Sequence, residues 1–274
     1  MKAGIIGGAG RMGKLFVPVF LRAGYEVLVS GRSTDLTAED LARQCDIVVV
    51  SVPIRATVKV IHRIAPLMGP GQLLCDFTSL KAKPVAAMLA SKACVVGLHP
   101  MFGPTVSSLK SQTIIVCPVR VEEHLLRKLV GVFRAEGARC TLTTPEEHDR
   151  MMAVVQGLTH YVTLCMAESI RRLGMDIKAT QEFTSPVYQI ELSLVGRLLS
   201  QDPELYADIL QLNPYVPEVL AACQASAGEL AKIVGSKDPG LFRAFFARNS
   251  RDFGPFCDEG MRMTDALIEC MVNR

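Results

Sequence analysis

The sequence predicts an α/β fold, with a Rossmann-like, doubly wound domain over residues 1–145 followed by an all-helical domain over residues 146–274. Three observations support this prediction. In the first half, short apolar and β-branched runs alternate with helix-like stretches; a glycine-rich turn follows the first run; and no strand pattern returns after about Pro145. Such alternation is typical of βαβ units and a mainly parallel sheet.

The predicted strands are nearly continuous apolar runs, which are typical of a parallel sheet covered on both faces. They occupy residues 2–6, 26–30, 46–52, 73–77, 94–98 and 113–117. The helices between them are expected near residues 11–23, 37–44, 55–67 and 82–91. A further helix near 121–135 and a short strand over 139–143 complete the first domain.

The pattern changes near Pro145, which marks the predicted domain boundary. A single long helix is expected from there, with Pro145 in its first turn and Gly174 just past its end. The remaining segments also have helical patterns, interrupted by Pro186, Pro203, Pro214, Pro217 and Pro239. A helical domain that follows a dinucleotide fold often dimerises, so we expect a homodimer formed through this domain.

The composition excludes several classes of protein. The net charge of +3 is too small to indicate a nucleic-acid or membrane-surface partner. Apolar stretches fall short of the roughly 20 residues that a membrane helix needs, and early glycines break any signal-peptide pattern. The nine cysteines form no C-x-x-C pair and no Cys/His spacing, so neither a metal site nor disulfides are expected. A reducing compartment, the cytoplasm, is the expected location.

A glycine-rich motif follows the first predicted strand. The segment "GIIGGAGRMGKLF" contains G-x-G-x-x-G as Gly8, Gly10 and Gly13, with Arg11 and Met12 between the last two glycines. These glycines permit a tight turn, close approach of the backbone to a pyrophosphate, and tight helix–strand packing. Although a structural glycine turn is the alternative, the strand–loop–helix context favours a dinucleotide site.

The end of the second predicted strand indicates which dinucleotide binds. An acidic residue there would bind the ribose 2′-hydroxyl of NAD, whereas an arginine accommodates the 2′-phosphate of NADP. Here Arg32, Ser33 and Thr34 follow the strand before any acid appears. We therefore expect NADP rather than NAD, the alternative being a solvated turn. Residues Ser51, Val52 and Pro53 are expected to border the same crevice.

Polar residues gather at the ends of two later strands, in "DFTSLKAKP" (76–84) and "GLHPMFGP" (97–104). Ser79, Lys81 and His99 are therefore expected to converge beside the nicotinamide, with His99 in a loop just past its strand. Taken singly, each has an ordinary structural explanation: a helix cap, a solvated lysine and a loop histidine.

Taken together, the motifs resemble those of the prephenate dehydrogenases over nearly the whole chain. They are "GGAGRMG", "VSVP", "DFTSLK", "GLHPMFGP", "EHDRMM", "QGLTHY" and "SPVYQIELSLVGRLLSQDPELYADI". The resemblance is strongest to the dehydrogenase part of bacterial enzymes that are fused to chorismate mutase. Because no mutase domain precedes Met1, the resemblance implies a free-standing dehydrogenase.

The resemblance implies oxidative decarboxylation of prephenate to 4-hydroxyphenylpyruvate, a step of tyrosine biosynthesis. It makes His99 the catalytic base and Ser79 the residue that hydrogen-bonds both the base and the substrate hydroxyl. It implies that Lys81 lines the substrate site and that His160, in "QGLTHY", contacts substrate from the helical domain. Arg197, in "LVGRLL", matches the arginine that binds the ring carboxylate.

The position of Arg197 gives this assignment some independent support. On a helix that begins at Pro186, Arg197 shares an apolar stripe with Ile190 and Leu194. An arginine there is unexpected unless it is paired or binds an anion, and a buried ion pair with Glu191 is the structural alternative. One departure from the family's pattern is Gln189, where bacterial relatives carry a second arginine. This puts in doubt any role of that position in substrate binding or tyrosine feedback.

Several other functions compete with this one. Arogenate or 4-amino-4-deoxyprephenate would be the substrate of a close relative, and both carry an amine for which we find no decisive acidic partner. β-Hydroxyacid and imine reductases share the domain order but usually carry a catalytic lysine or acid on the long helix, and they lack "HPMFGP". A non-catalytic NADP-binding sensor would not need Ser79, His99, His160 and Arg197 together.

Overall fold

The computed structural model describes residues 1–273, which form two compact units. Unit 1 comprises residues 1–153 together with residues 204–215, and unit 2 comprises residues 154–203 together with those from 216 onward. Residues 204–215, the second stretch of unit 1, follow Pro145, where the sequence pattern changes, by about 60 positions. The boundary at residue 145 stays a prediction, because it came from that pattern alone.

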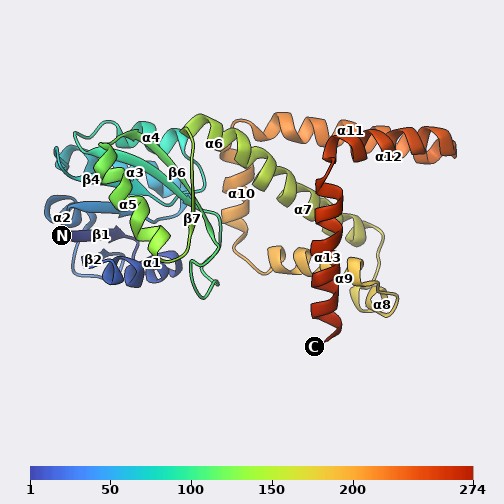
Figure 1. The fold of residues 1–274 in the computed structure, drawn as a ribbon, viewed down its shortest axis with the longest axis horizontal. Helices are drawn as coiled ribbons and strands as arrows, with labels where there is room; N and C mark the ends of the chain where they lie inside the picture. Colours follow the sequence, from blue (N-terminus) through green and yellow to red (C-terminus); the bar gives the residue numbers. More distant parts are fainter. Residues whose placement is uncertain (274) are drawn as a thin grey trace. The chain divides into compact units, whose positions relative to one another are not determined.

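Unit 1 is built on a seven-stranded sheet with strand order β2-β1-β3-β4-β5-β6-β7 (Figure 1). All neighbouring strands are parallel except β5 and β6, which pair antiparallel, so the predicted mainly parallel sheet is confirmed. The strands are β1 (Lys2–Ile6), β2 (Glu26–Ser30), β3 (Ile47–Val50), β4 (Leu73–Asp76), β5 (Cys94–Pro100), β6 (Thr113–Arg120) and β7 (Arg139–Leu142).

Helices cover both faces of this sheet, as a doubly wound fold requires (Figure 1). One face packs against α1 (Arg11–Arg22) and α5 (Glu123–Ala135). The other packs against α2 (Ala38–Gln44), α3 (Ile54–Ile64) and α4 (Ala82–Met88). A short 3₁₀ turn, η1 (Ala65–Leu67), follows α3.

The strand sequences account for these two layers, because successive side chains of a strand point to opposite faces. In β3, Ile47 and Val49 join the core under α1 and α5, whereas Val48 and Val50 join the core under α2, α3 and α4. All four side chains are buried. Continuous β-branched runs therefore serve two cores at once.

The strand that carries His99 is longer than expected. β5 extends to Pro100, and His99 pairs with Ile115 of the antiparallel strand β6. The expectation that His99 lies in a loop past the strand end is therefore wrong. Pairing with β6 continues the ladder for two residues beyond the apolar run. As a result, the His99 backbone belongs to the sheet itself and not to a loop.

The predicted long helix after Thr144 is divided into three parts. These are α6 (Pro145–Met152), a π-helical segment η2 (Ala153–Leu158) and α7 (Thr159–Arg172). The π-helical segment contains Val154, Val155 and Gly157, which are weak α-helix formers, so departure from α geometry costs little there. π-Helical turns of this kind frequently occur at functional sites.

Helix α10 (Pro203–Leu212) belongs to unit 1 although it lies between helices of unit 2 in the sequence. Asp208 and Ile209 on α10 are buried, and Asp208 forms an ion pair with Arg55 of α3, with 2.5 Å between Oδ1 and Nε. Five further helices belong to unit 2, together with α7 and nearly all of η2. They are α8 (Ile177–Glu182), α9 (Pro186–Leu199), α11 (Val216–Ser236), α12 (Pro239–Phe253) and α13 (Phe256–Val272).

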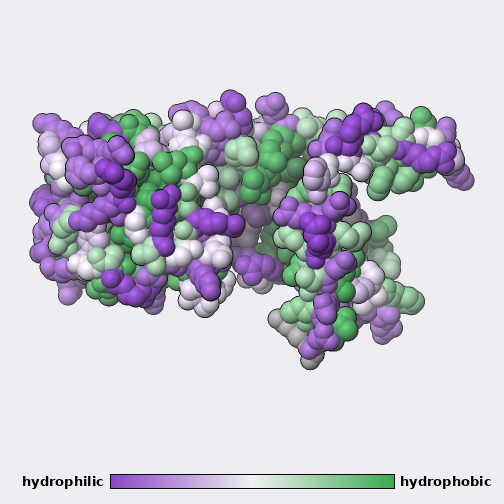
Figure 2. Space-filling view, in the orientation of Figure 1, coloured by the Kyte–Doolittle hydropathy of each residue, from purple (hydrophilic) through white to green (hydrophobic). Residues whose placement is uncertain are grey.

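Unit 2 has little buried core of its own. Large apolar side chains such as Phe183, Phe246 and Met261 are 88%, 65% and 64% exposed. Figure 2 shows such residues at the surface of the helices, interspersed with polar ones. In residues 1–273, every helix falls short of the length and apolar character that a membrane crossing requires.

Candidate active site

The glycine-rich loop joins β1 to α1 at the point where the strand order reverses between β1 and β3. Ligands of open α/β sheets bind outside the carboxyl ends of the strands at such a switch point. A Cβ atom on Gly13 would overlap the backbone of Gly8, and one on Gly8 would lie 2.7 Å from a methyl group of Val29. The loop therefore fits the close packing that a dinucleotide site needs.

One side of this loop opens on a groove of about 690 Å³. Arg32, Ser33 and Thr34 line it together with Ser51, Val52 and Pro53, so the two predicted segments meet as expected. Thr34 has a structural role in addition to lining the groove. Its hydroxyl accepts a hydrogen bond from the Gly31 amide at 2.7 Å. Its oxygen also lies 3.1 Å from the Leu36 carbonyl, so this hydroxyl shapes the turn.

The groove contains a second arginine that the sequence did not single out. Arg63, from α3, lines it and is paired with Glu39 at 2.8 Å from its Nε. Among the described residues that line this groove, none is acidic. A phosphate dianion there would meet the guanidinium group of Arg32 and that of Arg63, whose charge is already paired with Glu39.

The other side of the loop opens on a cavity of about 310 Å³. This cavity brings the glycine loop, the "SVP" segment and the predicted catalytic residues Ser79 and His99 to one place. Its lining consists of residues 10–13, 51–54, 77–79, 99–100 and 102–104, together with Leu205. Arg11 and Met12 belong to it, as does Leu205 from the returning helix α10.

His99 is buried and belongs to a chain of three side chains. Its Nδ1 lies 2.8 Å from Nε2 of His148, and Nδ1 of His148 lies 2.8 Å from Oδ1 of Asp149. All three residues are at most 3% exposed. Burial lowers the pKa of His99 well below its usual range, and the neighbouring His148 and the Lys81 ammonium lower it further. His99 is therefore neutral near pH 7 and can accept a proton.

Lys81 does not have the predicted place in the substrate site. It is fully buried, and its ammonium group pairs with the Asp76 carboxylate and donates a hydrogen bond to the Leu98 carbonyl at 2.7 Å. It is absent from the residues that line the His99 cavity. A buried ammonium requires such partners. We therefore correct its role: Lys81 joins the ends of β4 and β5 and contributes a positive charge near His99.

His160 and Arg197 belong to unit 2. His160, at the start of α7, is half-buried, and burial lowers its pKa below the usual value. Arg197, on α9, is exposed, whereas the buried residues of that helix are Val195 and Leu198. The alternative of a buried ion pair with Glu191 is therefore wrong. An exposed guanidinium is available to an anionic ligand.

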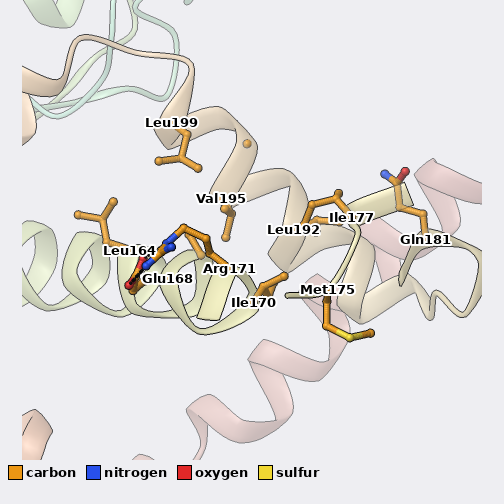
Figure 3. Close-up of a pocket in the computed structure, with 12 residues that line it drawn as sticks. Leu164, Glu168, Ile170, Arg171, Met175, Ile177, Gln181, Leu192, Val195 and Leu199 are labelled. Carbon is orange, nitrogen blue, oxygen red and sulfur yellow. Dashed lines mark hydrogen bonds and ion pairs between the residues drawn. The ribbon is translucent and has the colours of Figure 1, made fainter. Parts of the chain in front are cut away.

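A larger groove of about 820 Å³ lies elsewhere, between α7, α8 and α9 of unit 2. Figure 3 shows apolar side chains around it, among them Leu164, Leu192 and Val195, with the ion pair of Glu168 and Arg171 on α7. None of the predicted site residues lines it. Within residues 1–273, no group of three or more potential ligand side chains is arranged to hold a metal ion.

Several residues of the site were missed at the sequence level. His148 and Asp149 lie in "EHDRMM". Acidic residues such as Glu147 and Asp149 near the beginning of a helix are common, because they interact favourably with the helix dipole, and so they do not by themselves indicate a site. Leu205 and Arg63 reach their cavities only through the tertiary fold. The signal in the sequence was a histidine directly followed by an acid within the predicted helix, whereas their closeness to His99 depends on the tertiary fold.

The fold and the site together define a Rossmann-like protein of the dinucleotide-binding class, with a buried histidine beside the glycine-rich loop. The family is identified by two domain models. Residues 29–142 match the nucleotide-binding domain of prephenate dehydrogenase, and residues 144–259 match the dimerization domain of prephenate dehydrogenase. The chain belongs to the prephenate dehydrogenase family.

Individual relatives agree with this assignment. The chain is 34% identical over 283 aligned residues to a probable arogenate/prephenate dehydrogenase of Methanocaldococcus jannaschii, with 96% of the chain and 64% of the relative covered. It is 31% identical to the T-protein of Haemophilus influenzae, with 97% of the chain and 70% of the relative covered. The chain thus spans about two thirds of the length of these relatives.

The fold also matches solved structures. The prephenate dehydrogenase from Aquifex aeolicus, solved in complex with hydroxyphenyl propionate and NAD+, aligns with a TM-score of 0.72 and 20% identity. The alignment covers 92% of this chain and 97% of that chain. At this identity, the match supports the fold: a Rossmann-like domain followed by helices.

The buried neutral histidines predict a pH-dependent stability. The pKa values of His99, His148 and His160 are lowered in the folded state, with burial as the first cause in each. As the pH falls below about 6.5, the unfolded chain therefore binds protons that the folded chain does not. The free energy of unfolding should fall by up to about 1.4 kcal/mol per pH unit for each such histidine.

Urea denaturation at pH 7.5, 6.5 and 5.5 measures this dependence. Replacing His99 by Asn should flatten the slope, because it removes one of the buried histidines that cause it. A wild-type stability that is constant between these pH values would show that the buried histidines gain protons as readily as they do in the unfolded chain.

Proposed function

We propose that this protein is a prephenate dehydrogenase that catalyses the oxidative decarboxylation of prephenate to 4-hydroxyphenylpyruvate, with NADP as the favoured cofactor. The observation that carries the proposal is the single cavity lined by both the glycine loop and His99. A bound nicotinamide would supply the hydride acceptor there. Its family membership makes a cyclohexadienyl acid the substrate class.

His99 is the proposed general base. It takes the proton of the ring hydroxyl while a hydride leaves the same ring carbon, and the ring carboxylate departs as carbon dioxide. The ring thereby becomes aromatic, which drives the reaction. A neutral imidazole suits this task because burial lowers the pKa of His99, which keeps the ring uncharged and leaves a nitrogen lone pair to accept the proton. Ser79, which lines the same cavity, is proposed to hydrogen-bond the substrate hydroxyl and orient it toward His99.

Two residues of unit 2 are proposed to bind substrate. We assign recognition of the ring carboxylate to Arg197, because an exposed guanidinium can bind a carboxylate through paired hydrogen bonds. This contact must not over-stabilise a group that leaves during the reaction. His160 is proposed to contact substrate through its half-buried imidazole. Both roles rest on the family resemblance and on this chemistry.

Prephenate is favoured over its amino analogues by the charge of the cavity. Of the described residues that line the cavity of His99, none is acidic, and Arg11 adds a positive charge. A ring ammonium group, as in 4-amino-4-deoxyprephenate, would meet no carboxylate there. Arogenate carries its amine on the side chain and remains the closest alternative substrate. A non-catalytic NADP-binding protein is the alternative of another class.

Turnover assays test this function directly. With NADP, the purified protein should reduce the cofactor rapidly in the presence of prephenate, and more slowly with arogenate or 4-amino-4-deoxyprephenate. Absorbance of the reduced nicotinamide is the readout, with NAD assayed in parallel. Replacing His99 by Asn should remove most turnover and leave the Kd for NADP unchanged. Faster turnover of an amino analogue would make that analogue the substrate in place of prephenate. Tight NADP binding without any turnover would favour a non-catalytic NADP-binding protein.

Arg32 should discriminate between the two cofactors. It lines the groove beside the loop, where a guanidinium would bind the 2′-phosphate of NADP. Replacing Arg32 by Ala should raise the KM for NADP about 10-fold, as expected for loss of one charge-assisted hydrogen bond, and should leave the KM for NAD nearly unchanged. Arg43 of α2, exposed and outside the groove, is the matched control. Equal effects on both cofactors would contradict the assignment.

We also propose a homodimer formed through the helical region. Residues 144–259 match a dimerization domain, and the helices of unit 2 expose large apolar side chains, as does the groove in Figure 3. Exposed apolar surface of this extent is typical of an interface.

Sedimentation equilibrium should therefore give twice the mass of one chain. Replacing Phe246 on α12 by Glu should shift the protein toward monomer, whereas Leu21 on α1, which is also exposed and apolar, should tolerate the same change. A wild-type monomer at micromolar concentration would overturn the proposal.

A further inference from the structure

The strongest unassigned feature is the pair of residues behind His99. His148 and Asp149 are buried, they are adjacent in sequence at the middle of α6, and they lie 49 residues or more from the proposed base. Burying two imidazole groups and a carboxylate next to one another costs free energy unless every polar atom has a hydrogen-bond partner. The pattern of partners shows how the protons are arranged.

The Asp149 carboxylate is a pure acceptor. Its Oδ1 accepts a hydrogen bond from the Lys81 amide at 2.7 Å, and its Oδ2 accepts one from the Ala82 amide at 3.0 Å. Both amides belong to the start of α4, where a negative charge is favourable. This ionised carboxylate can only accept from His148, so the Nδ1 atom of His148 must carry a proton and donate it.

The proton arrangement then follows along the chain. A neutral His148 with a proton on Nδ1 has a lone pair on Nε2, which can only accept. The Nδ1 atom of His99 must therefore carry a proton and donate it to His148 across 2.8 Å. In neutral His99 this leaves the lone pair on Nε2. His148 and Asp149, which do not line the cavity, thus determine that Nε2 of His99 is the nitrogen that can act as base.

We propose that His148 is a positioning residue that holds His99 in the tautomer and orientation needed for proton abstraction, with Asp149 as the anchor of His148. This inference rests on the proposed function of His99. The arrangement has the logic of a serine–histidine–aspartate triad, in which a buried carboxylate sets the tautomer of the base. Here a second imidazole stands between the carboxylate and the base.

The anchor itself is held by rigid elements. Thr144 caps α6 by accepting a hydrogen bond from the Glu147 amide at 3.2 Å, and Pro145 occupies the first turn. The carbonyl of Asp149 accepts a hydrogen bond from the buried Asn213 side chain at 2.7 Å. A site is precise when the supporting residues are themselves locked in this way.

The charged groups around the chain are balanced. The Lys81 ammonium near His99 is paired with the Asp76 carboxylate, and Asp149 is compensated by the amides at the start of α4. No uncompensated negative charge of these two acids is therefore left to favour protonation of His99 before substrate binds. When His99 takes a proton, its Nδ1–H donation to His148 is retained and strengthened, because the donor is then charged.

Two substitutions at position 148 test the proposal. His148→Leu removes the acceptor at similar volume, whereas His148→Gln carries an amide oxygen near the place of imidazole Nε2. In His148→Leu, kcat with prephenate and NADP should fall roughly 10- to 100-fold, the range expected when the partner that orients a functional histidine is lost. The Kd for NADP should not change, and His148→Gln should recover most of kcat.

The tautomer of His99 is the second readout, and it needs no substrate. The chain has five histidines, so ¹H–¹⁵N correlation spectra of protein with ¹⁵N-labelled histidine can be assigned with single His→Asn variants. Wild-type His99 and His148 should each carry the proton on Nδ1. In His148→Leu, His99 should populate the Nε2–H form. A packing change alone, as in the control Met152→Leu on the same helix, should move neither tautomer nor kcat.

The outcomes separate the two proposals. Wild-type His99 with its proton on Nε2 overturns the inference, even if the Leu variant fails to fold. Unchanged kcat in His148→Leu, or a Gln variant no better than the Leu variant, also overturns it. If the wild-type protein turns over no cyclohexadienyl acid, the proposed function fails, whereas the spectra still report whether His148 sets the tautomer of His99.

Discussion

The carboxylate of Asp149 is the interaction on which the geometry of the candidate site depends. It accepts hydrogen bonds from the amides that begin α4, and it contacts His148, which contacts His99. Its own carbonyl is bound by Asn213 from the far part of the chain. Directly or through His148, this buried acid thus links β5, α4, α6 and the segment after α10. The energetic cost of burying it is offset because each oxygen has donors and the helix start is favourable for negative charge.

The charges of the site favour binding of anions, and they do not favour protonation of His99 before substrate binds. The cofactor groove and the catalytic cavity are lined, over the residues described, by arginines and hydroxyls without acids. Two buried acids behind the cavity are compensated, Asp76 by Lys81 and Asp149 by backbone amides. A cofactor with phosphates and a substrate with two carboxylates suit such a lining. The buried base remains neutral because burial disfavours its charged form.

Local patterns predicted much of the fold, because they depend on neighbours in sequence. Continuous runs such as Ile47–Val50 predicted buried strands, and Gly8, Gly10 and Gly13 predicted the loop at the switch point. Such patterns do not predict long-range pairing. Pairing with β6 extends the strand of His99, and the Asp76 carboxylate neutralises the buried Lys81. The return of α10 brings Asp208 into contact with Arg55, over 150 positions earlier, and no period in the sequence reveals this contact.

That return has a consequence for how the chain can be divided. Because residues 204–215 complete unit 1, the polypeptide passes between the two units at three places rather than one. A fragment that stops after Ala153 would lack Leu205 of the cavity wall, the ion-pair partner of Arg55 and the amide that holds Asp149. The nucleotide-binding part is therefore no contiguous module that recombination could transplant by a single cut. If the helices of unit 2 are exchanged between relatives, residues 204–215 must stay with unit 1, because they complete it.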